Sequence, residues 1–402
     1  MLDCPNTSTR IRKVRAELID RAAGLVPLLS RNAKETEVRR RIADENIEAM
    51  REAGLFRLLQ PTEFGGFETD ARTMIDVTAE LGRGCGSSAW VAAIYNGGSW
   101  LIAARFPRRA QLDVWEGHPE HSTVSVLPPS GQAIRNKGGY WVSGKWPFAS
   151  GSAHAEWAAV GIPARIDDAG NAVGVGFGLI SMAEMTVEDT WHVAGMRGTA
   201  SNTLVANNIF VPDYRIIDRD LLLHWHPNEK DTRPLYRTAP MSLPILSLVG
   251  PLIGVAEAAL EYAIEKAPSR SITYSRYLRQ TDSPSVHAAI QEAAMLIDSA
   301  RLHSYRAAAD IDAAAVEGVF PEKAIRARIR ADGAAAAQFC RKAVSLILSA
   351  HGTASMSDSS PLQRYWRDVE TGSRHALLNP GIAHEVLGRI LLGNCEPVTD
   401  VI

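Results

Sequence analysis

The chain has 402 residues, with 43 basic and 45 acidic side chains and a net charge of −2. Because binding to nucleic-acid phosphates needs a concentrated basic face, this balance argues against a nucleic-acid partner. No apolar stretch is expected to reach the ~20 residues of a membrane span, and the N-terminal 15 residues lack the apolar core of a signal peptide. The four cysteines are scattered without metal-ligand spacing. We therefore expect a reduced, cytoplasmic protein without a metal or a membrane partner.

Residues 1–118 are predicted to form an N-terminal α-helical domain. Helical periodicity runs through residues 8–31 and 36–59, and a shorter amphipathic helix is predicted over residues 74–81. Residues 87–104 are apolar and small, which indicates a buried helix.

From residue 119 to residue 218 the pattern changes to that of a middle β domain. Short alternating runs are separated by turns such as Asp167–Asn171, and they end in a strand over 207–211. Tyr140 to Lys145 alternate as a half-buried strand, Pro147 breaks the pattern, and apolar residues resume at 157–162. The small residues between the two runs allow close backbone approach to a flat cofactor, although a plain hairpin with a glycine turn explains the same pattern.

Residues 219–402 are predicted to form a C-terminal helical domain, with a linker or ordered loop at 219–240. Long Ala-rich helices with continuous apolar faces are typical of a four-helix bundle. The predicted helices span residues 244–267, 285–316, 322–350, 361–375 and 381–392.

Four stretches carry a resemblance to a known family. They are Pro61-Thr62-Glu63-Phe64-Gly65-Gly66, Ser143-Gly144-Lys145-Trp146-Pro147-Phe148-Ala149-Ser150-Gly151, Gly195-Met196-Arg197-Gly198-Thr199-Ala200-Ser201-Asn202 and Leu362-Gln363-Arg364-Tyr365-Trp366-Arg367-Asp368. In this order they resemble the acyl-CoA dehydrogenase superfamily over nearly the whole chain. More narrowly, they resemble the oxygenase components of two-component flavin-dependent monooxygenases, such as 4-hydroxyphenylacetate 3-hydroxylase and dibenzothiophene monooxygenase.

The resemblance implies an α+β fold that is mostly α: an N-terminal helical domain, a middle β-barrel or sandwich and a C-terminal four-helix bundle. It also implies a homotetramer that binds reduced flavin, FMNH2 or FADH2, between the β domain and the bundle. A separate NAD(P)H-dependent flavin reductase would supply that flavin, and O2 would be the co-substrate. Reaction through a C4a-hydroperoxyflavin would then hydroxylate a phenolic or polycyclic aromatic substrate.

Other functions of this fold stay open at the level of sequence. One is N-oxygenation of an amino sugar or an indole-type nitrogen, and another is acyl-CoA dehydrogenation with bound FAD. A dehydrogenase needs a carboxylate base, and only Asp368 and Glu370 stand near the expected position, neither in a dehydrogenase-like motif. A tetramer that has lost flavin and catalysis is a third possibility.

Ser150 and His375 are the catalytic candidates that the resemblance implies. A hydroxyl at Ser150 suits flavin N5 and would protect the oxygenated flavin, although a turn serine bonded to its own backbone looks the same in sequence. His375 suits proton transfer from a phenol or stabilisation of developing negative charge. A histidine near a helix end is also commonly a capping or surface residue.

Further flavin contacts are expected from aromatic, hydroxyl and guanidinium side chains. The candidates are Trp146, Phe148, Thr199, Ser201, Arg270 and Arg276. The aromatic residues would pack beside the ring, the hydroxyls would hydrogen-bond, and one arginine would hold the flavin phosphate. Core packing, turn chemistry and exposed helix arginines explain each of these patterns as well.

The buried helix over residues 87–104 lacks the substrate-contacting histidine found in many phenol-hydroxylating members. Tyr95 or Asn96 is expected to supply a polar substrate contact instead. Gly97 and Gly98 are expected to widen the pocket. This composition weakens assignment to a small phenol and leaves room for a bulkier ring.

Overall fold

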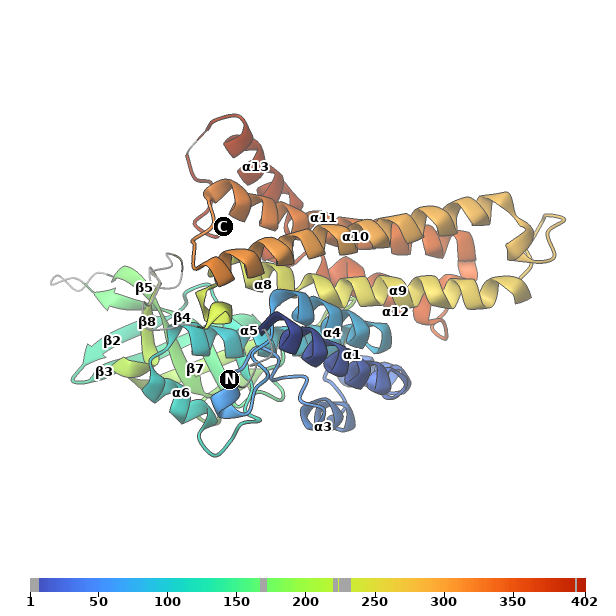
Figure 1. Cartoon of the computed structure of the whole chain (residues 1–402). Coiled ribbons are helices and arrows are strands. Elements are labelled where there is room, and N and C mark those ends of the chain that lie inside the picture. The colour runs from blue at the N-terminus through green and yellow to red at the C-terminus, as the bar shows by residue number, and fades with distance from the viewer. Residues whose placement is uncertain (1–6, 167–171, 220–222, 224–232, 395) are drawn as a thin grey trace, which may run out of the picture.

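The computed structural model describes residues 7–166, 172–219, 223, 233–394 and 396–402, with helices and strands arranged as in Figure 1. The N-terminal part is helical: α1 (Thr7–Arg31), α2 (Ala33–Arg39), α3 (Asp44–Glu52), α4 (Ala71–Gly84), α5 (Gly86–Arg105) and α6 (Arg108–Trp115). The buried helix expected over 87–104 is confirmed by α5, whereas one helix over 36–59 is wrong. Left-handed backbone at Arg40 (φ 55°) separates α2 from α3, and left-handed backbone at Gly54 (φ 76°) follows the end of α3.

Two four-stranded sheets form the middle β part. The strands are β1 (Thr123–Val126), β2 (Gln132–Asn136), β3 (Gly139–Ala149), β4 (Trp157–Ile166), β5 (Ala172–Ser181), β6 (Thr186–Glu188), β7 (Asn202–Pro212) and β8 (Ile216–Asp218). Their orders are β1-β4-β5-β8 and β2-β3-β7-β6. The turn expected at Asp167–Asn171 lies outside the described residues.

The strands β3 and β4 belong to different sheets, so the hairpin interpretation of residues 139–162 is wrong. β3 continues through Pro147, and its register with β7 shifts between Trp146 and Ala149. Such a bulge bends the strand and redirects its side chains. The chain then crosses from one sheet to the other through Ser150 and its neighbours, which places this segment at an edge of the sandwich.

Helices also form the C-terminal part, and α10 and α11 are the longest of those described. They are α8 (Ser242–Ser247), α9 (Val249–Lys266), α10 (Pro284–Glu317), α11 (Lys323–His351), α12 (Pro361–Gly372) and α13 (Pro380–Leu391). The α9–α10 connection projects from the end of the bundle that lies opposite the β part (Figure 1). One stretch, Ser242–Ser269, is long and apolar enough for a membrane span, contrary to expectation. However, 83% of its most apolar window is buried inside the fold, as in a core helix.

Glycines bring α4 and α9 into close contact and thereby join the N-terminal helices to the bundle. A Cβ added at Gly254 would lie 1.8 Å from the carbonyl oxygen of Ala79, and one at Gly250 would lie 2.1 Å from Thr78 Oγ1. A backbone carbonyl cannot turn away as a side chain can. This crossing therefore requires glycine for close approach.

We expect Gly254→Ala to lower the free energy of unfolding by about 3 kcal/mol or more, because the helices must separate to admit the methyl group. Gly24→Ala is the matched control, since α1 leaves open space around Gly24 and alanine favours a helix interior by roughly 0.5–1 kcal/mol. Urea unfolding followed by circular dichroism measures both. Equal stability of the two variants would contradict the packing argument.

Candidate active site

A chain of hydroxyl groups connects the edge of the sandwich to a buried loop. Ser150 Oγ lies 2.7 Å from Ser201 Oγ, which lies 2.7 Å from Thr199 Oγ1. Thr199 Oγ1 in turn donates to the Met196 carbonyl at 2.9 Å. Thr199 and Ser201 are only 1% and 4% exposed, whereas Ser150 is partly exposed. The three predicted hydroxyl residues are therefore brought together, with Ser150 at the open end.

The backbone next to these three hydroxyl residues is strained. Phe148, Met196 and Ala200 all have left-handed φ values (65°, 52° and 46°), which non-glycine residues rarely adopt. The Gly151 N–H donates to the Thr199 carbonyl at 2.7 Å and so ties the two strained segments together. Strain of this kind costs of order 1–3 kcal/mol per residue and gathers at functional sites.

Asp368, at the end of the fourth motif, connects the bundle to this loop. Its Oδ1 accepts the backbone N–H of Met196 at 2.5 Å, and the side chain is buried. A Cβ at Gly195 would lie 1.9 Å from the Arg367 carbonyl, so the loop lies directly against α12. Burial raises the pKa of Asp368 to about 6, although the Met196 N–H opposes that shift. Sequence reasoning missed this role, for which the Trp-Arg-Asp motif was the available signal.

His375 follows α12 and faces the same region. Its ring centroid lies 5.8 Å from that of Trp90 on α5. A Cβ at Gly372 would lie 3.0 Å from Met196 Cε and 3.1 Å from Trp90 Cζ3, so these residues meet at one point. Burial lowers the pKa of His375 to about 4. Its Nδ1 accepts the Leu377 N–H at 3.2 Å, which places the proton of the neutral imidazole on Nε2.

The helix α5 lies between the histidine and the serine. Tyr95 Oη donates to the Gly151 carbonyl at 2.6 Å, five residues along α5 from Trp90. Five residues of helix span about 7.5 Å along the axis and turn about 140° around it, so His375 and the Ser150 segment contact different faces of α5. Because Tyr95 is fully buried and bonded to Gly151, it positions the Ser150 turn, and a substrate contact for it finds no support.

The substrate contact predicted for Asn96 finds no support in this geometry, because backbone groups engage its side-chain amide. Asn96 is fully buried. Its Oδ1 accepts the Leu58 N–H at 2.7 Å, and its Nδ2 donates to the carbonyls of Leu55 and Ala92, both at 2.8 Å. Gly98 does not widen a pocket either, because a Cβ there would lie 2.2 Å from the Thr123 carbonyl, whereas Gly97 has open space around it.

The two aromatic residues expected beside the flavin differ. Trp146 is fully buried, and its Nε1 donates to the Gly161 carbonyl at 2.7 Å, joining the two sheets through the core. This side chain is part of the core, so the predicted flavin contact of Trp146 finds no support. Phe148 is 70% exposed, and its ring meets Trp191 edge-on at 6.1 Å between centroids. This aromatic pair borders Ser150, and Trp191 was not anticipated from sequence.

Arg270 and Arg276 lie away from the hydroxyl chain. They follow α9 in the connection at the tip of the bundle (Figure 1), where Arg270 Nη2 donates to the His351 carbonyl at 3.2 Å. Leu252 of α9 is the residue near Gly372, and Arg270 lies roughly 27 Å further along the helix axis. Within one chain, neither arginine reaches the site around Ser150.

The nearby carboxylates are not available as a dehydrogenase base. Asp368 is engaged by Met196, and Glu370 Oε2 accepts from Arg341 Nη2 at 2.8 Å and also pairs with Arg374. These ion pairs lower the pKa of Glu370 against the opposing effect of burial. Both carboxylates therefore serve packing between helices and loop.

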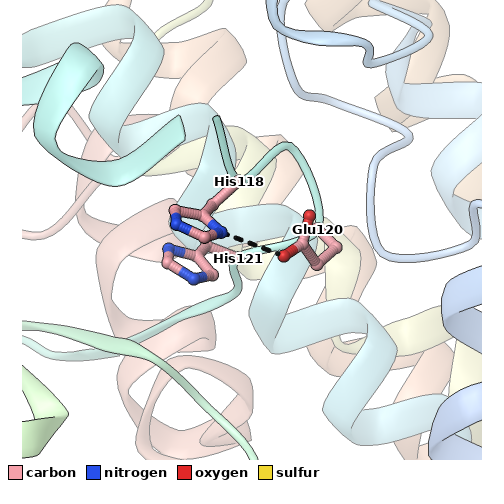
Figure 2. Close-up of side chains that lie close together, drawn as sticks. All are labelled: His118, Glu120 and His121. Carbon is pink, nitrogen blue, oxygen red and sulfur yellow. Dashed lines mark ion pairs between the residues drawn. The ribbon is translucent and has the colours of Figure 1, made fainter. Parts of the chain in front are cut away.

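A second group of ligating side chains lies between α6 and β1 (Figure 2). Donor atoms of His118, Glu120 and His121 all lie within 4.8 Å of one another, and the two imidazoles stack at 4.5 Å. His121 Nδ1 donates to the Val114 carbonyl at 2.9 Å. The donor types suit a transition metal, but His118 is 61% exposed. The group shares no residue with the hydroxyl chain and takes no part in the function argued below.

Comparisons with known proteins identify the family and the fold of this chain. Two family models match: acyl-CoA dehydrogenase, N-terminal domain, over residues 20–115, and acyl-CoA dehydrogenase, C-terminal domain, over residues 246–380. The flavin-dependent monooxygenase oxygenase subunit HsaA of Rhodococcus jostii (strain RHA1) is 32% identical over 384 residues, 95% of this chain and 99% of that protein.

Two further relatives are similar over almost their whole length. The FADH(2)-dependent resorcinol hydroxylase, oxygenase component, of Rhizobium sp. (strain MTP-10005) is 29% identical, covering 95% of both chains. The solved structure of XiaF from Streptomyces sp. in complex with FADH2 and glycerol superimposes with a TM-score of 0.92 at 36% identity, covering 98% of this chain and 99% of that one.

We expect the buried Asp368 to make stability depend on pH. The native carboxyl holds its proton up to about pH 6, whereas the unfolded one releases it near pH 4. The native state therefore binds more protons between these values, and the free energy of unfolding falls as pH rises through them, by about 3 kcal/mol. In Asp368→Asn this contribution should vanish, because the amide does not titrate.

Urea unfolding of the two proteins at pH 4.5 and pH 7.5 measures the difference. Asp368→Ala is the contrasting variant, because it leaves the Met196 N–H without its acceptor and should lose about 1–3 kcal/mol at both pH values. An identical pH dependence in the wild type and in Asp368→Asn would refute the assigned titration.

Proposed function

Because the chain belongs to the oxygenase components of two-component flavin-dependent monooxygenases, which share the acyl-CoA dehydrogenase fold, we propose that it hydroxylates an aromatic substrate with O2 and reduced flavin. A separate NAD(P)H-dependent flavin reductase supplies the flavin. One oxygen atom enters the substrate, the other leaves as water, and the flavin returns oxidised. The observation that carries this proposal is the series of hydroxyls that ends at Ser150. His375 packs against Trp90 on α5, the same helix whose Tyr95 holds the Ser150 turn.

The residues around Ser150 fit a flavin. The partly exposed Ser150 ends the series of hydroxyls, and the exposed Phe148 with Trp191 offers an apolar edge that a flat ring would cover. The strained backbone at Phe148 and Ala200 holds these groups in place. When bound, reduced flavin supplies the electrons that activate O2, while Ser150 orients its N5 and the buried surroundings exclude water.

FADH2 is the form of flavin that we favour over FMNH2. The relative from Rhizobium is named an FADH(2)-dependent enzyme, and the XiaF structure contains FADH2. Both are similar to this chain over at least 95% of its length. A dibenzothiophene monooxygenase relative that holds FMN is only 19% identical and so supports the fold alone.

The substrate class that we propose is a phenol on a fused or substituted ring. The relatives are named for hydroxylating resorcinol and p-hydroxyphenylacetate. In this chain Trp90 lies beside His375, and Gly97 leaves open space on α5. The aromatic side chain of Trp90 and the open space at Gly97 favour a larger ring that is held by apolar contact.

A homotetramer would complete the flavin site. Arg270 lies roughly 27 Å along the helix axis from Leu252, the α9 residue near Gly372, and Arg276 follows it in the same connection. We infer that they hold a flavin phosphate in a neighbouring copy. Tyr274 and Leu278 in the same connection are 106% and 82% exposed, and large exposed apolar side chains together mark an interaction surface. Guanidinium groups beside them suit phosphate through paired hydrogen bonds.

The direct test is a reconstituted assay with a flavin reductase, NADH, O2 and a phenolic substrate. The isolated chain should not consume NADH, whereas the mixture should form product with little hydrogen peroxide. Ser150→Ala should release most reducing equivalents as hydrogen peroxide, because N5 loses its partner. Ser152→Ala is the matched control, since Ser152 donates to the Ala200 carbonyl at 2.8 Å and takes no part in the series of hydroxyl hydrogen bonds from Ser150 to Thr199. NADH turnover by the chain alone would contradict the function.

His375 is expected to act as a hydrogen-bond donor to the developing phenolate. Its low pKa and the occupied Nδ1 leave Nε2–H as the group that faces a ligand. His375→Ala should lower product formation about 100-fold, in the range found for loss of a preorganised donor. His375→Gln should lose less, because it keeps an N–H donor and an acceptor for Leu377.

The pH dependence of product formation distinguishes a hydrogen-bond donor from a general base at His375. With a pKa of about 4, His375 stays neutral from pH 6 to pH 8, so single-turnover product formation should not titrate with it in this range. A rate that rises with an apparent pKa between 6 and 7 in the wild type, and not in His375→Gln, would establish a base instead.

A further inference from the structure

We propose that Thr199 and Ser201 are positioning residues that make Ser150 a hydrogen-bond acceptor and thereby select reduced over oxidised flavin. The inference rests on the proposed function, because it assumes that Ser150 faces flavin N5. It goes further in assigning the redox preference to two buried hydroxyls that do not touch the ligand. The argument depends on the direction of three consecutive hydrogen bonds.

The Met196 carbonyl determines that direction. A carbonyl oxygen can only accept, and Thr199 Oγ1 lies 2.9 Å from it. If the Thr199 proton pointed elsewhere, two oxygen lone pairs would face each other at this distance without a proton between them. Thr199 therefore donates to Met196, and its single proton is used.

The remaining hydroxyls follow in sequence. Thr199 Oγ1 can only accept from Ser201, at 2.7 Å, so Ser201 donates its proton to Thr199. Ser201 Oγ can then only accept from Ser150, also at 2.7 Å. The Ser150 proton is consequently directed inward, and the group that Ser150 presents outward is a lone pair. Successive bonds in one direction also polarise and strengthen one another.

The other partners of the loop keep this direction in place. The Met196 carbonyl also accepts from Trp191 Nε1 at 2.9 Å and from the Thr199 N–H at 3.2 Å, and the Met196 N–H donates to Asp368. Hydrogen bonds on both sides of Met196 therefore hold its carbonyl in place as the acceptor that faces Thr199 Oγ1. Thr199 and Ser201 are also buried from solvent, so water does not compete for their protons.

An outward lone pair distinguishes the two redox states of flavin. In reduced flavin N5 carries a hydrogen and donates, whereas in oxidised flavin N5 has a lone pair and accepts. Ser150 as arranged here makes a hydrogen bond with the reduced form and meets the oxidised form with two lone pairs opposed. Because the oxidised flavin is held less tightly after turnover, it leaves more readily and reduced flavin can take its place.

The test is the ratio of dissociation constants for FAD and FADH2, measured anaerobically by titration of the full chain. In the wild type, FADH2 should bind at least tenfold more tightly. In Thr199→Val, Ser201 loses its acceptor and can donate to Ser150, which then points its proton outward. The ratio should fall about tenfold, the equivalent of one net hydrogen bond.

Thr199→Ser is the matched control, because it keeps the hydroxyl and should keep the wild-type ratio. Ser152→Ala should keep it as well. Ser201→Ala provides a second variant if Thr199→Val does not fold, and it should also lower the ratio, since the Ser150 proton loses its inward acceptor. A ratio unchanged in both folded variants, or equal weakening of both flavins, overturns the inference.

The wild type separates this inference from the function on which it rests. Equal affinity for FAD and FADH2 in a chain that still forms hydroxylated product overturns only the directional argument. Absence of binding by either flavin overturns the proposed function itself.

Discussion

The hydrogen bond from the Met196 N–H to the buried carboxyl of Asp368 is the contact on which the site depends. Asp368 belongs to the bundle, and Met196 belongs to a loop between two strands of the β part. A buried acceptor shared by two structural units is costly to lose, because its partner then stays unsatisfied. Together with the hydrogen bond from Arg367 Nη1 to the Ala194 carbonyl and the close approach of Gly195 to α12, this bond holds the loop against the bundle next to the strained backbone at Met196 and Ala200.

The rigid loop at Met196 orients the hydroxyl groups of the site. The Met196 carbonyl directs Thr199, and small buried hydroxyls transmit that direction to the edge of the sandwich. On the other side, α5 carries Trp90 toward His375 and Tyr95 toward Gly151. One straight helix thereby spaces the two reactive ends of the site. Neither end needs a flexible element to reach the other.

The geometry also shows what a single chain does not supply. The Ser150 turn and His375 both contact α5 within one copy, but the arginines suited to a flavin phosphate lie at the far tip of the bundle (Figure 1). Long antiparallel helices are well suited to carry such groups into a neighbour, because they hold a side chain rigidly far from its own core. Sharing of this kind would couple assembly to flavin binding in the proposed tetramer.

The sequence alone determined the order of helical, β and helical parts, the family and the candidates Ser150 and His375, since periodicity and motifs are local properties. It could not show that Trp146 faces the core or that the Asn96 amide is hydrogen-bonded to backbone groups. Nor could it show that Thr199 and Ser201 are hydrogen-bonded in series with Ser150. Alternation identifies two faces of a strand but not which face a ligand covers. Only the tertiary structure decided the hydrogen-bond directions, because partners such as Met196 and Asp368 lie 172 residues apart in sequence.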